Sequence, residues 1–336
     1  MNQDRSTNWI VTGLIGGLLV FSLVTTLAES GDLGSFGITV LSGLFQGMLL
    51  FLVASGLSIV FGLMDILNLA QGAYFMLGAY VAYAIHHADA LASMNPDLRF
   101  LLALIVATLV GAIAGVILER GLIRPLYDRP VFQIVMTFGV AIVVGEFIRS
   151  IWGTTTYRWL SDFSIQENTF VLFGQQFSLY RLFVIVMGFV LIGLITLLLR
   201  RTRIGIIIRA GVEDSAMVEA LGINVRLVFT LVFTLGCAVA AFGGGVAAPF
   251  LGASLSMGNR FLLGSIAVIV LGGLGSFEGT AIGSIIVGLA LSVVDKFQLQ
   301  FLNQTIWSSM TPMILLAIVL LLRPNGLYGK ERGGNA

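Results

Sequence analysis

The chain has 336 residues, of which 57% are hydrophobic and only 10% are charged, and its mean hydropathy is +1.01. A soluble domain carries about 25% charged residues, and a soluble fold of this composition would expose large apolar patches that monomers avoid. The composition therefore indicates an integral membrane protein. The net charge of +1 argues against a nucleic-acid partner, and the single cysteine, Cys237, excludes an internal disulfide and is interpreted as a small core residue.

Apolar runs follow one another along the chain, and a spanning helix needs about 20 mostly apolar residues. The clear runs are 9–28, 36–62, 100–118, 131–148, 182–199, 227–251 and 305–322. Three shorter stretches, 72–85, 261–271 and 280–294, bring the crossings to ten, or leave eight if they pair as re-entrant segments. The predicted fold class is all-α: one polytopic integral membrane helix bundle over residues 1–336, with 8–10 transmembrane helices.

A glycine-rich stretch from Gly56 to Tyr80 interrupts the second apolar run with polar side chains. Asn68 and Gln71 lie three residues apart and share a face of a helix. Polar groups at membrane depth tend to face a bundle interior or a water path. We predict that Asn68, Gln71 and Gly72 line a translocation path, with helix bridging as the equal alternative. Asp65 is expected at the membrane boundary.

Glu146 is an acid within an otherwise apolar run, and Arg149 follows it one turn later. It is a candidate residue of the translocation path. An ion pair between the two residues is the alternative reading.

The polar loop 200–226 contains a short amphipathic stretch. Apolar residues recur at helical spacing from Val212 to Leu221 and include Met217. Glu213 and Asp214 fall in the first turn, where carboxylates complement the helix dipole. Gly222 follows as the expected end. The pattern predicts one helix about 15 Å long, which either rests on lipid or, since its outer residues are acidic, docks on a protein.

A second glycine-rich interruption, Leu271 to Ser284, surrounds a single acid, Glu278. We include Glu278 in the predicted path. Paired breaks of this kind point to internal repeats in transporters. We therefore predict repeat halves at about 36–180 and 181–322.

The basic residues predict the orientation. With ten crossings, one side of the membrane holds Arg5, Arg120, Arg124, Arg129, Arg200, Arg201, Arg203, Arg209, Arg226, Arg323, Lys330 and Arg332. The other side holds Arg99, Arg149, Arg158, Arg181, Arg260 and Lys296. The excess marks the cytoplasmic face, so both termini are predicted to be cytoplasmic. No GxxxxGK[ST] loop occurs, so the chain is not expected to hydrolyse ATP itself.

Three motifs resemble the branched-chain amino acid (Liv-type) ABC importer permeases, in the same order, over about residues 41–326. The first is the stretch 62–80, with Asn68, Ala70, Gly72 and Gly78-Ala79-Tyr80. The second is the loop with Gly205, Arg209-Ala210, Glu213-Asp214 and Ala220 to Asn224, and the third is Leu271 to Ser276 with Gly279. Gln71 departs from the pattern, since many members have histidine there.

The resemblance implies a permease subunit of an ATP-driven importer in the bacterial cytoplasmic membrane. Its expected partners are two ATPase subunits, a second permease of the same or a related chain, and an external solute-binding protein. ATP is hydrolysed by the partners, and this chain binds no cofactor. The implied ATPase-coupling residues are Arg209, Glu213, Asp214, Met217, Leu221 and Gly222. Branched-chain or other amino acids are the implied solutes; urea, short amides and aromatic acids are carried by relatives of similar pattern.

Two other functions fit parts of the pattern. An ion-coupled secondary transporter would need an essential embedded carboxylate, for which Glu146 is the candidate. An intramembrane hydrolase would need a nucleophile such as Ser254 or Ser276. The histidines, His86 and His87, have no acid nearby in the sequence, so the chain is not expected to be an enzyme, nor to hold a metal.

Overall fold

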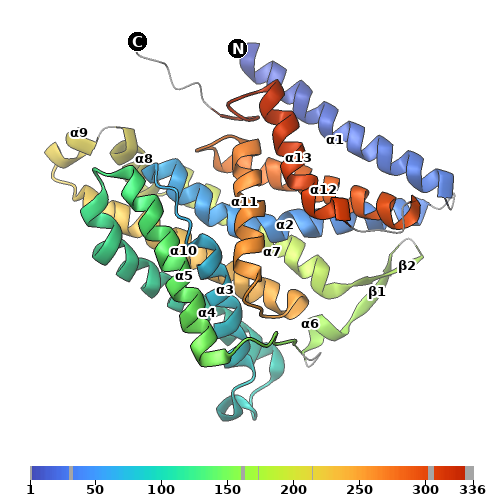
Figure 1. The fold of residues 1–336 in the computed structure, drawn as a ribbon, viewed down its shortest axis with the longest axis horizontal. Helices are drawn as coiled ribbons and strands as arrows, with labels where there is room; N and C mark the ends of the chain where they lie inside the picture. The colour runs from blue at the N-terminus through green and yellow to red at the C-terminus, as the bar shows by residue number, and fades with distance from the viewer. Residues whose placement is uncertain are drawn as a thin grey trace.

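Helices make up most of the computed structural model, which describes residues 2–29, 33–159, 163–172, 174–213, 215–301 and 306–329. The long helices are α1 (Asn2–Glu29), α2 (Leu33–Met64), α3 (Gln71–His86), α4 (Pro96–Leu118), α5 (Pro130–Trp152), α7 (Leu179–Arg201), α10 (Val225–Leu251), α11 (Met257–Gly272), α12 (Phe277–Phe301) and α13 (Ile306–Leu322) (Figure 1). The shorter elements are α6 (Ser164–Glu167), β1 (Thr169–Leu172), β2 (Gln175–Ser178), α8 (Arg203–Glu213) and α9 (Ser215–Ala220).

The predicted membrane helix bundle is confirmed. Every predicted apolar run coincides with a helix, except that Thr305 lies outside the described residues. Seven helices of the described chain are long and apolar enough to cross a membrane: α1, α2, α4, α5, α7, α10 and α12. The three shorter predicted stretches correspond to α3, α11 and α12. Helix α12 has 25 residues and is long enough to span the membrane, whereas α3 and α11 have 16 residues each. The all-α description omits one feature, the antiparallel hairpin β1–β2 before α7.

Helices α2 and α10 form the centre of the bundle, and both are largely buried. Helix α10 packs on α2, α3 and α4, and α2 packs on α12. Glycines allow this close approach: a Cβ atom at Gly244 of α10 would collide with the Phe75 carbonyl of α3, and one at Gly78 with the Ala241 carbonyl. Small residues at helix contacts are the usual means of tight packing in lipid.

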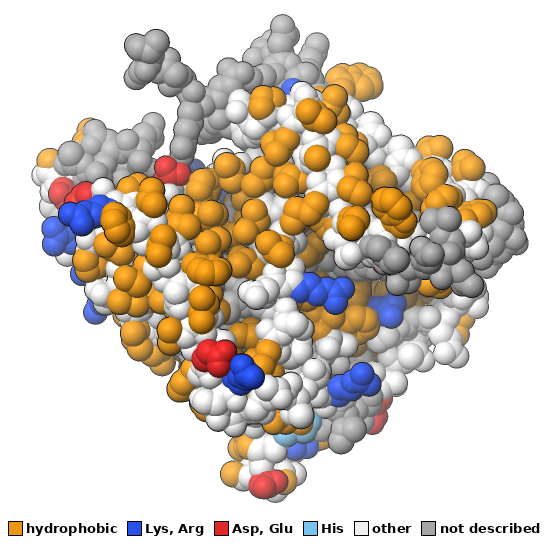
Figure 2. Space-filling model, in the orientation of Figure 1, with side chains coloured by type: hydrophobic (Ala, Val, Ile, Leu, Met, Phe, Trp, Pro, Cys, Tyr) orange, Lys and Arg blue, Asp and Glu red, His pale blue; other side chains and the backbone are white. Residues whose placement is uncertain are grey.

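Helices α4 and α5 present apolar side chains to the surroundings. Leu101, Ile105 and Leu109 of α4 are exposed at helical spacing, as are Val135 and Phe138 of α5. Figure 2 shows hydrophobic side chains across the middle of one face, whereas most charged side chains lie at its upper left and in its lower part. A lipid-facing band requires this distribution.

Two breaks separate α2 from α3 and α10 from α11. Helix α2 ends where Asp65 takes a positive φ of 55°, and Asp65 is exposed there, as expected for a residue at the boundary. Helix α10 ends at Leu251, and Gly252 follows it with a φ of 75°. The starts of α3 and α11 meet through Gly72 and Gly258. The first turns of α3 and α11 therefore lie against each other, and the repeat boundaries near 36–180 and 181–322 stay a prediction.

The helices end on two sides of the bundle. Figure 1 places the start of α1, the end of α13, and helices α8 and α9 along the upper edge, and the α3–α4 connection at the lower tip. Backbone hydrogen bonds from Leu327 to Leu271 and from Tyr328 to Gly272 tie the end of α13 to the end of α11 on the upper side. We call this the α8 side.

Candidate functional site

The segment between α7 and α10 forms two helices, not one. The predicted single helix from Val212 to Leu221 is wrong at its start, because α8 already begins at Arg203. Thr202 caps α8: its Oγ1 accepts a hydrogen bond from the Gly205 N–H at 3.1 Å. A threonine at this position satisfies one of the free amides of the first turn. Helix α8 contacts α2, α7 and α10, so the segment is attached to the core at several places.

Helix α9 ends as predicted at Gly222, whose φ is 81°. The Gly222 N–H donates to the Glu219 carbonyl at 2.9 Å, and the Ile223 N–H donates to the Val218 carbonyl at 3.3 Å. This pair of bonds is the Schellman motif, which needs a left-handed residue at the position of Gly222.

Helix α9 and the residue after it expose apolar side chains next to the exposed Glu219. Val218 packs inward at 4% exposure, whereas Met217 is 62% exposed and Leu221 is 71% exposed. The two exposed side chains lie four residues apart and so share one face. Of the other residues predicted here, Asp214 and the side chain of Glu213 lie outside the described residues.

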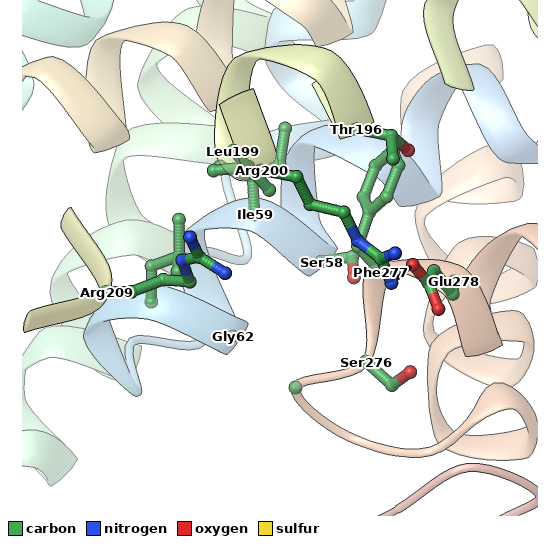
Figure 3. A pocket seen from close by; sticks show the side chains of 12 residues that line it. Ser58, Ile59, Gly62, Thr196, Leu199, Arg200, Arg209, Ser276, Phe277 and Glu278 are labelled. Carbon is green, nitrogen blue, oxygen red and sulfur yellow. Dashed lines mark hydrogen bonds and ion pairs between the residues drawn. The ribbon is translucent and has the colours of Figure 1, made fainter. Parts of the chain in front are cut away.

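A cavity of about 580 Å³ opens beside α8, between the ends of α2 and α7 and the start of α12. The Arg200 guanidinium of α7 donates to a Glu278 carboxylate oxygen of α12, and Arg209 of α8 faces the cavity from the other side (Figure 3). Both members of the ion pair are more than half exposed. We call this space the α8 cavity; it brings together Arg209 and Glu278, which were predicted for different roles.

Asn68, Gln71 and Gly72 lie in the packed core and not in the α8 cavity. Asn68 is fully buried; its amide donates to Gln71 Oε1 at 3.3 Å, and its Oδ1 accepts from the Ala70 N–H at 3.0 Å. Gln71 Nε2 donates to the Gly236 carbonyl of α10 at 2.8 Å. These contacts are those of the helix-bridging alternative, and the role of the three residues in a path stays a prediction.

Glu146 does not meet the other predicted site residues. Its carboxylate lies 3.5 Å from Arg149, with both side chains more than half exposed on α5. The ion pair given as the alternative reading is therefore present.

The two histidines belong to an aromatic cluster. The ring of His86 stacks on Trp159 with centroids 4.6 Å apart, and His87 Nδ1 lies 3.0 Å from the Tyr83 carbonyl. In the described part of the chain, no group of three or more His, Cys, Asp or Glu side chains could hold a metal ion.

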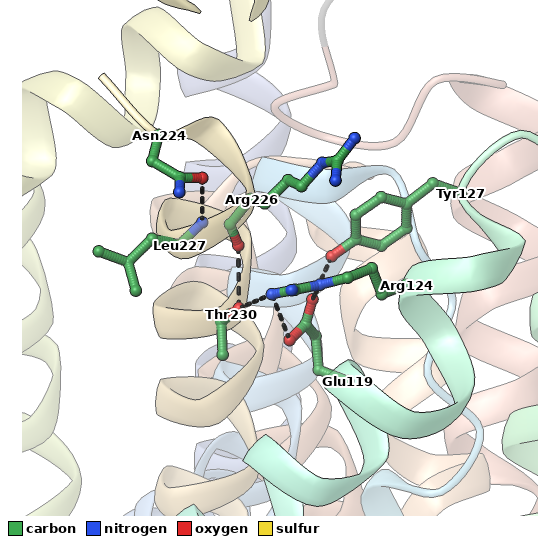
Figure 4. A network of polar contacts seen from close by, with 7 residues as sticks. All are labelled: Glu119, Arg124, Tyr127, Asn224, Arg226, Leu227 and Thr230. Carbon is green, nitrogen blue, oxygen red and sulfur yellow. Dashed lines mark hydrogen bonds and ion pairs between the residues drawn. The ribbon is translucent and has the colours of Figure 1, made fainter. Parts of the chain in front are cut away.

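A polar network that the sequence did not reveal lies under the α4–α5 connection (Figure 4). Glu119 is fully buried and accepts hydrogen bonds from Tyr127 at 2.6 Å and from Arg124 at 3.3 Å. Arg124 also donates to Thr230 of α10 at 2.8 Å. Burial raises the pKa of Tyr127, and the Glu119 carboxylate raises it further, so Tyr127 stays a hydroxyl donor.

The network ties α4 to the segment that follows α9. Thr230 donates to the Arg226 carbonyl at 2.9 Å, and Asn224 caps α10 by accepting from the Leu227 N–H at 3.2 Å. The five residues Glu119 to Ile123 form one turn of π-helix, an irregularity that is frequent at functional sites.

Comparison with known proteins identifies the family of the chain. Residues 39–321 match the family described as branched-chain amino acid transport system / permease component. The chain is 29% identical to the high-affinity branched-chain amino acid transport system permease protein LivH of Escherichia coli K12, over 86% of this chain and 94% of LivH. It is also 29% identical to the BraD permease protein of Pseudomonas aeruginosa, over 86% and 94% of the two chains.

A further similar protein comes from a third organism. A probable branched-chain amino acid transport permease protein LivH of Methanocaldococcus jannaschii is 30% identical, over 84% of this chain and 89% of that protein. No solved structure matches. The match over most of the chain, together with the helical membrane fold, shows that the chain belongs to the branched-chain amino acid transport system permease family.

Proposed function

We propose that this chain is a transmembrane subunit of an ATP-driven importer that carries branched-chain amino acids, or other amino acids, into the cytoplasm. The membership of the permease family supports the transport of amino acids. The chain contains no phosphate-binding GxxxxGK[ST] loop, so under this proposal ATP is hydrolysed by partner subunits and this chain binds no cofactor.

The exposed apolar face of α9 carries this proposal. Met217 and Leu221 project from a helix that is capped, attached to the core through α8, and joined directly to α10. Exposed apolar side chains on a polar connection mark a docking surface. We assign the α9 face to an ATPase groove, and we keep Arg209, Glu213 and Asp214 as coupling residues from the sequence.

The same assignment fixes the orientation. Five arginines lie in α8 or close to α8 and α9, and basic residues gather on the cytoplasmic side of membrane proteins: Arg200, Arg201, Arg203, Arg209 and Arg226. The α8 side is therefore cytoplasmic. The protein lies in the inner membrane of the cell, with both termini on the cytoplasmic side. The remaining partners are a second permease subunit and an external solute-binding protein on the opposite side.

Uptake by whole cells tests the function. A strain that lacks this gene should lose uptake of radiolabelled L-leucine, and a plasmid copy should restore it. Arsenate, which depletes ATP, should stop the restored uptake, whereas ionophores that collapse proton and sodium gradients at maintained ATP should not. Uptake that follows an ion gradient instead would favour a secondary transporter and refute the proposal.

The α9 face has its own test. The double variant Met217→Arg with Leu221→Arg should abolish uptake while the protein remains in the membrane, because two unpaired charges would face an apolar groove. Val171→Arg is the matched control, since Val171 is 68% exposed on β1, away from α9. Normal uptake by the double variant would remove α9 from the docking surface.

A further inference from the structure

A second cavity, of about 510 Å³, lies at the end of the bundle opposite α8. The early turns of α2, α7, α11 and α13 and the late turns of α10 and α12 line it. Its volume is within the range of about 300–1,000 Å³ typical of small-molecule sites. We call it the distal cavity. Under the proposed orientation, it lies toward the external side.

Two arginines of the distal cavity have no acidic partner in the described chain. Arg181 of α7 is half-buried, and its guanidinium lies over the rings of Phe250 at 5.1 Å and Phe45 at 5.6 Å. Its Nε is buried and makes no hydrogen bond with a described residue. Arg260, in the first turn of α11, is exposed and forms no ion pair there either. Removing a guanidinium from water costs free energy unless an anion pairs with it. The parallel N–H donors of a guanidinium match the two oxygens of a carboxylate.

The distal cavity also contains one acid. Asp295 of α12 is half-buried, and among the described residues its side chain accepts one hydrogen bond, to Oδ2 from Gln46 Nε2 at 3.2 Å. An ionised carboxylate offers about four acceptor sites, so Asp295 retains capacity for a cationic donor. The neighbouring Lys296 does not use it, because Lys296 Nζ donates to Thr26 and Ser35.

The remaining wall is largely apolar. Phe45 packs edge-to-face on Phe250 with ring centroids 4.6 Å apart, and Leu49 and Phe261 line the same space. Arg181, Arg260 and Asp295 are the only charged side chains on its described lining. The cavity thus offers separate positive and negative groups beside apolar surface, which neither a simple anion nor a simple cation would complement.

We propose that the distal cavity binds a zwitterionic amino acid with an apolar side chain. Arg181, assisted by Arg260, takes the α-carboxylate, Asp295 takes the α-ammonium group, and the side chain packs on Phe45, Leu49 and Phe261. This inference rests on the proposed function, and it adds a binding site for the solute on the permease itself.

Ligand binding to the full chain in lipid nanodiscs tests the site. The probes are L-leucine, isocaproate (which lacks the ammonium group) and L-leucinamide (which lacks the carboxylate), titrated to millimolar concentrations by ligand-observed NMR. L-leucine should bind the wild-type chain. Arg181→Gln and Asp295→Asn should each weaken L-leucine by about tenfold or more, as expected for a lost charge-assisted hydrogen bond.

The two shortened ligands separate a binding role from misfolding. Arg181→Gln should lose isocaproate and keep L-leucinamide at the wild-type affinity, and Asp295→Asn should do the reverse. Arg158→Gln, at an exposed arginine outside the cavity, should change none of the three. Absence of L-leucine binding, or an equal loss of all three ligands in both cavity variants, would overturn the proposal.

This assay needs neither ATP nor a partner subunit, so it separates the two proposals. ATP-dependent uptake by cells without binding in nanodiscs would refute the distal site alone. Selective binding in nanodiscs with gradient-driven uptake would refute the ATP-driven function and leave the site standing.

Discussion

Breaking the buried Glu119–Arg124 pair should cost more stability than breaking a surface ion pair. The Glu119 side chain is fully buried, while the Arg124 side chain is 33% exposed. Removing one partner of a fully buried pair costs about 3–5 kcal/mol. Because Arg124 is partly solvated and a glutamine can still accept from Tyr127, we expect Glu119→Gln to cost about 2 kcal/mol of unfolding free energy.

A double-mutant cycle isolates the interaction itself. Glu119→Gln, Arg124→Gln and the double variant should give a coupling energy of about 1–2 kcal/mol, measured by unfolding in mixed detergent micelles. The matched control is the Glu146–Arg149 pair, which has the same chemistry at 65% and 56% exposure. That pair should couple by about 0.5 kcal/mol or less. Equal coupling in the two cycles would refute the reasoning from burial.

Three further variants probe particular contacts. Gly244→Val should lower stability by several kcal/mol or prevent assembly, because its Cβ would meet the Phe75 carbonyl; Gly139→Val, in open space, should be nearly neutral in the same unfolding assay. Gly222→Ala should cost about 1 kcal/mol, because alanine disfavours the φ of 81°, and it should reduce leucine uptake if α9 must keep its C-terminal end. Asn68→Leu should cost about 1–3 kcal/mol by removing the hydrogen bonds to Ala70 and Gln71; unchanged stability would show that these bonds contribute nothing.

The helices were predictable because lipid imposes a simple rule on the sequence. A segment that must satisfy its own backbone in hydrocarbon is long, helical and apolar, and the runs that became α2, α7 and α10 follow this rule. The end of α9 was predictable for a local reason, since Gly222 is the residue that a left-handed C-terminal position favours.

The start of α8 and the contacts between polar groups of different helices follow less directly from the sequence. Threonine is a favoured N-cap residue, so Thr202 could have indicated the start of α8. The apolar residues at helical spacing begin at Val212 and therefore predict a later start. The contact between Arg124 and Thr230 joins residues 106 positions apart, and Arg200 meets Glu278 across 78. Such pairs depend on which helices become neighbours, and helix packing in lipid is governed by small residues whose pairing a single sequence does not specify.

Helix α2 provides the physical link between the two cavities. Its residues 42–50 reach the distal cavity and its residues 58–63 reach the α8 cavity, while Phe51 to Leu57 between them lie buried in the bundle. A solute that passed along α2 from one cavity to the other would have to cross this buried stretch. Its contacts with α12 and α10 run through Gly47 and Gly56, where the absence of a side chain lets the helices approach closely. Helix α8 contacts both α9 and α2, so under the proposed function a movement of α9 would be passed to α2 through α8.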